Sequence, residues 1–290
     1  MVTMGKVLSL LRSTIQAWQR DEASRLAAAL AYYTTFSLSP VLVIVIAIAG
    51  SVFGQEAVQG QLVDQLSGLV GREGAEVIQS LISNTETSGD GFWPTLISAV
   101  LLIFGATGVF SQLQTSLNKI WNVSPPDQGI GRMVRIRLLS FAMVAAIGFL
   151  LLVSLMISAG LAALGSLLGD GHLWQIVNTV LSLGVTTLLF ALIYKVLPDV
   201  EITWRDVGVG AVITSLLFSF GKFLIGLYLG NSSIGSAYGA AGSLAIVLIW
   251  VYYSAQILFF GAEFTQVYAN RYGSKIVASR SSSSHGIPQR

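Results

Sequence analysis

The feature that most limits the fold of this chain is the long apolar segment 26–50, which reads LAAALAYYTTFSLSPVLVIVIAIAG. About 20 apolar residues in a helix cross the hydrocarbon core of a bilayer, so this segment predicts a transmembrane helix. Its second half is rich in valine and isoleucine, its first half carries small and hydroxyl-bearing residues, and Pro40 lies between them. A proline inside a span needs neighbouring helices, hydroxyls or water to bind the carbonyl that it frees. The first half is therefore expected to face protein or a polar cavity.

The composition indicates that this span is one of several. Of the 290 residues, 53% are hydrophobic and 10% are charged, whereas about 25% are charged in an ordinary globular domain. We therefore predict an all-α integral membrane protein with a membrane domain over residues 26–265 and six transmembrane helices. These spans are predicted at 26–52, 93–112, 138–168, 174–197, 207–229 and 240–263.

The segments outside the spans have patterns of their own. Residues 1–25 predict a cytoplasmic amphipathic helix on the membrane surface, because one helical face between Met4 and Arg20 carries Val7, Leu8, Leu11, Ile15 and Trp18. The loop 53–92 between spans one and two repeats apolar residues at helical spacing on both sides of a glycine break, which predicts an external helical hairpin. The tail 266–290 is basic and lacks apolar periodicity, so we expect it to be cytoplasmic and disordered.

The basic residues predict the orientation of the chain in the membrane. The loops assigned to one side hold 14 of the 16 lysines and arginines, while the opposite side holds only Arg72 together with half of the acidic residues. Because basic loops stay in the cytoplasm, both termini are predicted to be cytoplasmic. The remaining basic residue, Lys222, lies inside the fifth span. This charge pattern reflects topology and an affinity for anionic lipid, and it gives no indication of nucleic-acid binding.

The polar half of the first span supplies the first candidate path residues. Ala28, Tyr32, Thr35 and Ser39 recur at helical spacing and are expected to share one face, directly before Pro40. This face can line a substrate path, or it can be a hydroxyl-rich seam at which helices pack.

Further candidates lie in the fifth and sixth spans. Lys222 is either a buried cation at a substrate path or a lysine whose long stem lets its charge reach the interface. The uncharged segment GNSSIGSAYGAAGS, which contains Tyr238 and Gly239, predicts either a broken, re-entrant element beside Lys222 or a tight connection. Gln256 and Glu263 extend a polar face along the sixth span; the alternative for Glu263 is a carboxylate bonded to cytoplasmic lysine or arginine.

Four segments of the chain carry a resemblance to a known family. In order, they read AAALAYYTTFSLSP, FGATGVFSQLQTSLNKIWNV, GSAYGAAGSLAIVLIWVYYSAQI and FFGAEF. They resemble the YihY/virulence factor BrkB family of bacterial inner-membrane proteins over nearly the whole chain, from Asp21 to Tyr272. The resemblance implies six spans, and links of its members to serum resistance and to the export of envelope lipid or lipopolysaccharide. An older label of the family, ribonuclease BN, is regarded as a misassignment.

The residues argue independently against an enzyme. A nuclease needs clustered metal ligands or an acid–base pair, but the two histidines, His172 and His285, lie in a short external loop and in the tail. The sequence has no cysteine and no phosphate-binding or hydrolase motif, so we expect no catalytic residue, no metal site and no cofactor. The expected function is transport or accommodation of lipid-like or amphipathic anionic molecules in envelope biogenesis. An ion-coupled solute transporter and a non-transporting envelope scaffold are the alternatives, the expected partners are anionic membrane lipids, and a homo-oligomer stays open.

Overall fold

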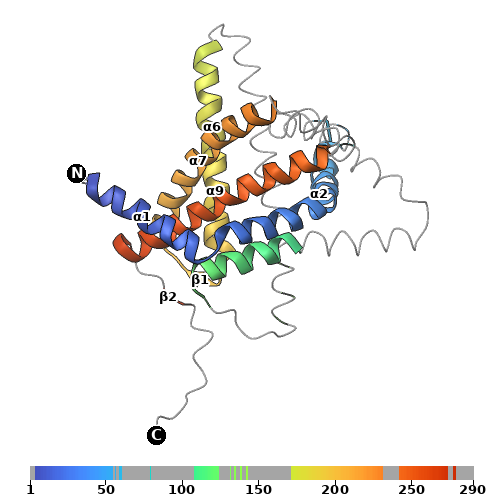
Figure 1. Ribbon diagram of the computed structural model, residues 1–290. Helices are drawn as coiled ribbons and strands as arrows, with labels where there is room; N and C mark the ends of the chain where they lie inside the picture. Colours follow the sequence, from blue (N-terminus) through green and yellow to red (C-terminus); the bar gives the residue numbers. More distant parts are fainter. Residues whose placement is uncertain are drawn as a thin grey trace.

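A computed structural model describes residues 4–54, 56, 59–60, 79, 108–123, 131, 134, 138, 142, 171–230, 242–273 and 277–278. Within these residues the fold is helical. The labelled helices are α1 Met4–Arg20, α2 Ala23–Phe53, α6 Gly171–Val196, α7 Trp204–Gly230 and α9 Gly242–Tyr272. Residues 108–120 form a further helix, drawn in green in Figure 1. Two strands of two residues each, β1 Val200–Glu201 and β2 Val277–Ala278, pair antiparallel, with Val200 opposite Ala278.

Helix α9 is the centre of the described bundle. It packs against α7 on one side and against α2 and α1 on the other, while α6 packs against α7. Figure 1 shows this order, with α9 running between α2 and α7. The shared core combines alanines, large aliphatic residues and aromatic rings, among them Ala27, Leu117, Tyr194 and Phe259.

Among the described residues, three helices contain stretches that are long and apolar enough to cross a membrane: Thr179–Val196, Trp204–Ile225 and Leu244–Tyr272. At most a third of the residues in each of these stretches are buried inside the protein. Large apolar side chains such as Val180, Leu216 and Phe220 are exposed instead. Helices that are apolar on their outer faces are stable when lipid surrounds them, which agrees with the predicted membrane protein.

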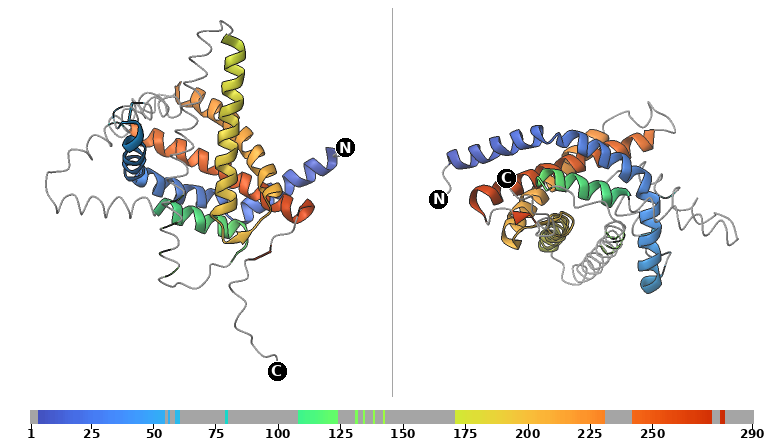
Figure 2. Two further views of the ribbon diagram at one scale, coloured as in Figure 1. Left: turned by 180° about the vertical axis from the view of Figure 1, so that it is seen from behind. Right: turned by 90° about the horizontal axis from the view of Figure 1, so that it is seen from below.

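The α2 helix is 31 residues long and is not interrupted at Pro40. It is followed by the cap residue Gly54, whose φ of 87° favours glycine. Its ribbon changes direction along its course (Figure 2). Proline is a usual cause of such a bend, because its ring removes one hydrogen bond of the helix.

The structure corrects the predicted start of the tail, and a second helix runs past a predicted span end. The tail does not begin at 266, because α9 continues to Tyr272 and residues 277–278 pair with β1. The extension forms because Gln266 and Ala269 are buried. The second span is predicted to end at Gln112, and the helix 108–120 runs past this position to residue 120, with Leu117 and Ile120 fully buried.

Several predictions lie outside the described residues. They are most of the hairpin 53–92, most of the spans 93–112 and 138–168, and the tail beyond 278. The six-span count therefore stays a prediction. The α1 helix has the predicted bounds, and its apolar side chains Val7, Leu8, Leu11 and Ile15 are exposed, while Leu10, Thr14 and Ala17 are buried.

Candidate functional site

The α1–α2 corner is a two-residue turn made by Asp21 and Glu22. Asp21 continues the hydrogen bonding of α1, since its N–H donates to Ala17 O at 2.9 Å, and Glu22 O accepts from the N–H of Arg25 at 2.8 Å to start α2. Glu22 has φ 55° and ψ 42°, the left-handed conformation. This conformation costs a residue with a side chain about 1–2 kcal/mol. The surrounding contacts must therefore hold the corner in place.

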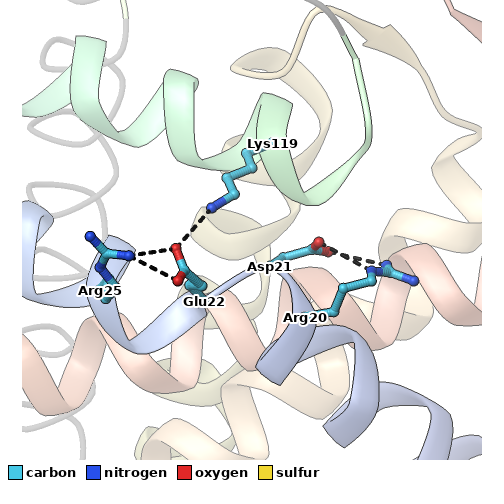
Figure 3. Close-up of polar contacts among 5 residues, drawn as sticks. All are labelled: Arg20, Asp21, Glu22, Arg25 and Lys119. Carbon is cyan, nitrogen blue, oxygen red and sulfur yellow. Dashed lines mark hydrogen bonds and ion pairs between the residues drawn. The ribbon is translucent and has the colours of Figure 1, made fainter.

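Ionic contacts hold the corner from both sides (Figure 3). The Arg20 guanidinium donates to both oxygens of Asp21 at 3.2 Å. The Arg25 guanidinium donates to both oxygens of Glu22 at 2.8 and 2.9 Å, and Lys119 Nζ lies 3.7 Å from Glu22 Oε2. Hydrogen bonding and attraction from Arg25 hold the pKa of the Glu22 carboxyl below its usual value. The corner is thereby tied to the end of the 108–120 helix.

Glu263 on α9 lies buried beside this corner. Its side chain has no exposed surface, and neither carboxylate oxygen has a hydrogen-bond donor among the described residues. The neighbouring ionisable groups that act on it are Asp21 and Arg20. Asp21 is itself buried, whereas the Arg20 side chain is 62% exposed and already bonded to Asp21. A buried carboxylate without a donor is costly, on the order of several kcal/mol.

A second polar atom without a partner lies on the same face of α9. Gln256 Oε1 is buried and has no hydrogen-bond donor in the part of the chain that the structure describes. Gln256 precedes Glu263 by two helical turns, so both side chains project from one face. Native proteins leave few buried polar atoms without partners, and each such atom points to an unseen water, ion or substrate.

A polar clamp lies next to the corner and joins the 108–120 helix to the α6–α7 connection. Asn118 Nδ2 donates to Asp199 Oδ2 at 3.0 Å, and the backbone N–H of Asp199 donates to Asn118 Oδ1 at 2.8 Å. Gln114 Nε2 donates to the same carboxylate at 3.3 Å. In the last turn of α6, Lys195 Nζ donates to Ile202 O and lies 5.9 Å from the centre of the Trp204 ring. These contacts fix the end of the bundle at which Glu263 lies.

The predicted path residues of α2 are placed differently from one another. Tyr32 is 58% exposed and contacts the rings of Tyr33 and Phe36, whereas Thr35 is buried and its hydroxyl donates to Ala31 O at 2.8 Å. The predicted common face is therefore not uniform in exposure. Ser39 and Pro40 lie within the helix, but their side chains are outside the described set.

The other predicted path residues also differ in whether they are exposed or buried. Lys222 is exposed between the exposed rings of Phe220 and Phe223, which favours the interpretation that its charge reaches the interface over that of a cation facing the bundle. Tyr238 and Gly239 lie outside the described residues. Glu263 is not bonded to lysine or arginine among the described residues. The structure thus brings Gln256 and Glu263 together on one face and does not add Lys222 to them.

Sequence reasoning missed Asp21 and the Asn118–Asp199 clamp. Asp21 lies in a charged run, a pattern that is typical of a solvated helix start and gives no sign of burial. Asn118 lies beyond the predicted end of its span, in a polar stretch. A signal was available in that stretch, because Leu113, Leu117 and Ile120 continue the helical spacing into a buried face. Groups of three or more histidines, cysteines or carboxylates that could hold a metal ion are absent from the described residues.

Comparisons with known proteins agree with this architecture. The family model described as virulence factor BrkB matches residues 14–285. A UPF0761 membrane protein of Psychrobacter sp. is 26% identical over 88% of the chain and 47% of its own length. A UPF0761 membrane protein of Teredinibacter turnerae is 26% identical over 94% of the chain and 63% of its own length. A UPF0761 membrane protein of Psychromonas ingrahamii is 27% identical over 91% of the chain and 90% of its own length. The chain thus spans about half to two thirds of the first of these relatives, and no solved structure matches it significantly.

Proposed function

We propose that the chain, which belongs to the virulence factor BrkB family, is a transport protein of the bacterial inner membrane for lipid-like or amphipathic anionic molecules. The observation that carries this proposal is the polar face of α9, where Gln256 Oε1 and both oxygens of Glu263 are buried without hydrogen-bond donors inside a stretch long enough to span a membrane. Polar and ionisable groups at such depth are costly and usually mark a substrate or ion path. The proposal includes no enzymatic reaction.

The arrangement of charged segments supports the predicted orientation. The end of the 108–120 helix contacts the α1–α2 corner through Lys119 and Glu22, and the α6–α7 connection through Asn118 and Asp199. The end of α9 contacts α1, because Arg271 Nη1 donates to Ser9 Oγ at 3.2 Å. The described basic residues of these four segments therefore gather at one end of the bundle. This is the arrangement expected if both termini are cytoplasmic.

The exposed surface supports a lipid environment for the substrate. The apolar stripe of α1, made by Val7, Leu8, Leu11 and Ile15, is exposed at the basic end of the bundle. A helix with an exposed apolar stripe beside basic residues binds at a bilayer surface, with preference for anionic lipid. An anionic amphipathic molecule would meet the protein there with its headgroup near the basic residues.

A transport assay tests the proposal. Purified protein in liposomes is tested for the movement of a headgroup-labelled anionic lipid between leaflets, with an externally added quencher as the readout. We expect Gln256→Leu to lower this rate at least about tenfold, although removing a buried polar atom without a partner stabilises the fold. Gln112→Leu is the matched control, since Gln112 lies on the 108–120 helix and donates a hydrogen bond to Ser116 of that same helix.

The two possible roles of Gln256 give opposite results. A residue that only fills the core predicts a more stable Gln256→Leu variant with an unchanged rate. An unchanged rate in this variant, or wild-type protein that moves no labelled lipid, would refute the proposed path.

A second candidate, an ion-coupled solute transporter, is favoured by the buried carboxylate of Glu263. It predicts that a pH gradient drives solute uptake in liposomes whose lipid label stays in place.

A further inference from the structure

The contact between Glu263 and Asp21 brings two acidic side chains together in the protein interior. Both are buried, and they come from α9 and from the α1–α2 corner. Two ionised carboxylates offer only acceptors, so neither can donate to the other. This explains why both oxygens of Glu263 are without a donor although Asp21 lies beside it.

The charged groups around the pair are unequally distributed. Arg20 bonds to Asp21 through two nitrogens, so the negative charge of Asp21 is compensated. Arg25 and Lys119, contributed by α2 and the 108–120 helix, are bonded to Glu22. The described residues of α7 contribute no ionisable group that acts on Glu263. Glu263 is thus the carboxyl group of the corner that lacks a cation of its own.

We propose that Asp21 and Glu263 form a proton-binding site, in which the protonated Glu263 carboxyl donates a hydrogen bond to the Asp21 carboxylate. One added proton satisfies the donor requirement, leaves a single negative charge on the pair and keeps that charge next to Arg20. Two carboxylates that share a buried site do not ionise together readily. Release of the proton leaves two adjacent negative charges, which repel each other and push the α1–α2 corner away from α9.

A metal cation is a poorer occupant of the pair. Hard cations require about six or more oxygen ligands. The pair offers four carboxylate oxygens, two of which already accept hydrogen bonds from Arg20. A proton needs only one donor and one acceptor, which is what the two side chains provide.

Infrared spectroscopy on the full chain in lipid nanodiscs tests the site directly. At neutral pH, the wild type is expected to show the C=O stretch of a protonated carboxylic acid, shifted in D₂O. This band should disappear in Glu263→Gln and stay in Glu201→Gln, which removes an exposed carboxylate of β1. A wild type without the band, or a Glu263→Gln variant that keeps it, would overturn the proposal.

A second variant covers the case in which Glu263→Gln does not fold. In Asp21→Asn the new amide donates to the Glu263 carboxylate, so the proton is no longer needed and the band should again be lost. Retention of the band in Asp21→Asn would count against a shared proton. Loss of the wild-type band on adding NaCl at fixed pH and constant ionic strength would show that sodium competes for the site, and would overturn the assignment to a proton.

The coupling of this site to transport rests on the proposed function, whereas the site itself does not. If the proton drives transport, Glu263→Gln abolishes the dependence of lipid movement on a pH gradient. A normal infrared band in a protein that moves no lipid would refute the proposed function alone. Lipid movement by a wild type that lacks the band would refute the proton site alone.

Discussion

Gly210 on α7 gives a quantitative test of the packing on which the candidate site depends. A Cβ atom at this position would overlap Oγ1 of Thr265 on α9 and lie 2.7 Å from its Cβ and 2.9 Å from its Cγ2. Thr265 is fully buried, and its hydroxyl donates to Gly261 O at 2.6 Å. In Gly210→Ala, therefore, either Thr265 loses this hydrogen bond or α7 and α9 move apart.

The expected change in the free energy of unfolding of Gly210→Ala is the sum of opposing effects. Overpacking in a core costs about 1–3 kcal/mol, and the loss of one hydrogen bond costs about 1 kcal/mol. Replacing a helical glycine by alanine returns up to about 1 kcal/mol. The expected net loss in the free energy of unfolding is about 1–3 kcal/mol for Gly210→Ala.

Gly208 is the matched control on the same helix, because a Cβ there would meet nothing within 4 Å. Gly208→Ala should leave stability unchanged or raise it by up to about 1 kcal/mol. Unfolding of both variants is measured by steric trapping at one ratio of detergent to lipid. Equal stabilities of Gly210→Ala and Gly208→Ala would refute the close approach of α7 to α9. A double-mutant cycle with Thr265→Ala should recover part of the loss.

Three further predictions concern polar contacts near the same end of the bundle. Tyr194→Phe removes the hydrogen bond that the buried phenol donates to Leu258 O at 2.7 Å, so the free energy of unfolding should fall by about 1 kcal/mol in the same steric-trap assay. Asn118→Ala removes both hydrogen bonds to Asp199; a loss of about 1–3 kcal/mol is expected, and an unchanged value would show that the clamp contributes nothing. The pKa of Glu22 is lowered by Arg25 from its ordinary value of 4.5, so its stabilising effect is present above about pH 4.5 and is lost as the pH falls through the lower folded pKa. Glu22→Gln should therefore be less stable than the wild type at neutral pH, with a difference that disappears in acid.

Much of the fold could be predicted from the sequence, because long apolar segments and helical spacing are local signals. The α1 bounds agree with the predicted helix, and α2, α6 and α7 begin and end within a few residues of predicted spans. Helix α9 and the 108–120 helix extend beyond the predicted span ends, in last turns that carry polar side chains. Gln266 and Asn118 are buried there. A single sequence does not indicate that such a residue has a partner on another helix.

The candidate site could be predicted only in part for the same reason. Glu263 and Gln256 were identified because polar residues are rare in an apolar span, and their rarity is visible in the sequence. Their surroundings were not predictable, because Asp21 lies nearly the whole chain length away from Glu263. In a run of charged residues, a buried carboxylate is indistinguishable from its exposed neighbours. Exposure also separates Tyr32 from Thr35, although helical spacing had placed them on one face.

The two sides of α9 differ in the kind of contact that they make, and this difference predicts where proton release acts. The α7 side is interlocked, because Gly210 and Gly261 bring backbone against the side chains of Thr265 and Thr214. The corner side holds the carboxyl pair beside a residue in the left-handed conformation, so the repulsion that follows proton release arises on this side. Raising the pH should therefore lengthen the distance from α9 to the corner and leave the distance from α9 to α7 unchanged.

The chain has no native cysteine, so spin labels can be introduced in chosen pairs. Cysteines at the exposed positions Gln19 and Asn270 report on the corner, and cysteines at the exposed Val212 and Leu248 report on the α7 side. A pH-dependent change should appear in the first pair and vanish in the Glu263→Gln background, because the glutamine amide cannot ionise. A change of equal size in both pairs would contradict a hinge at the corner, since it would mean that α9 moves against the whole bundle.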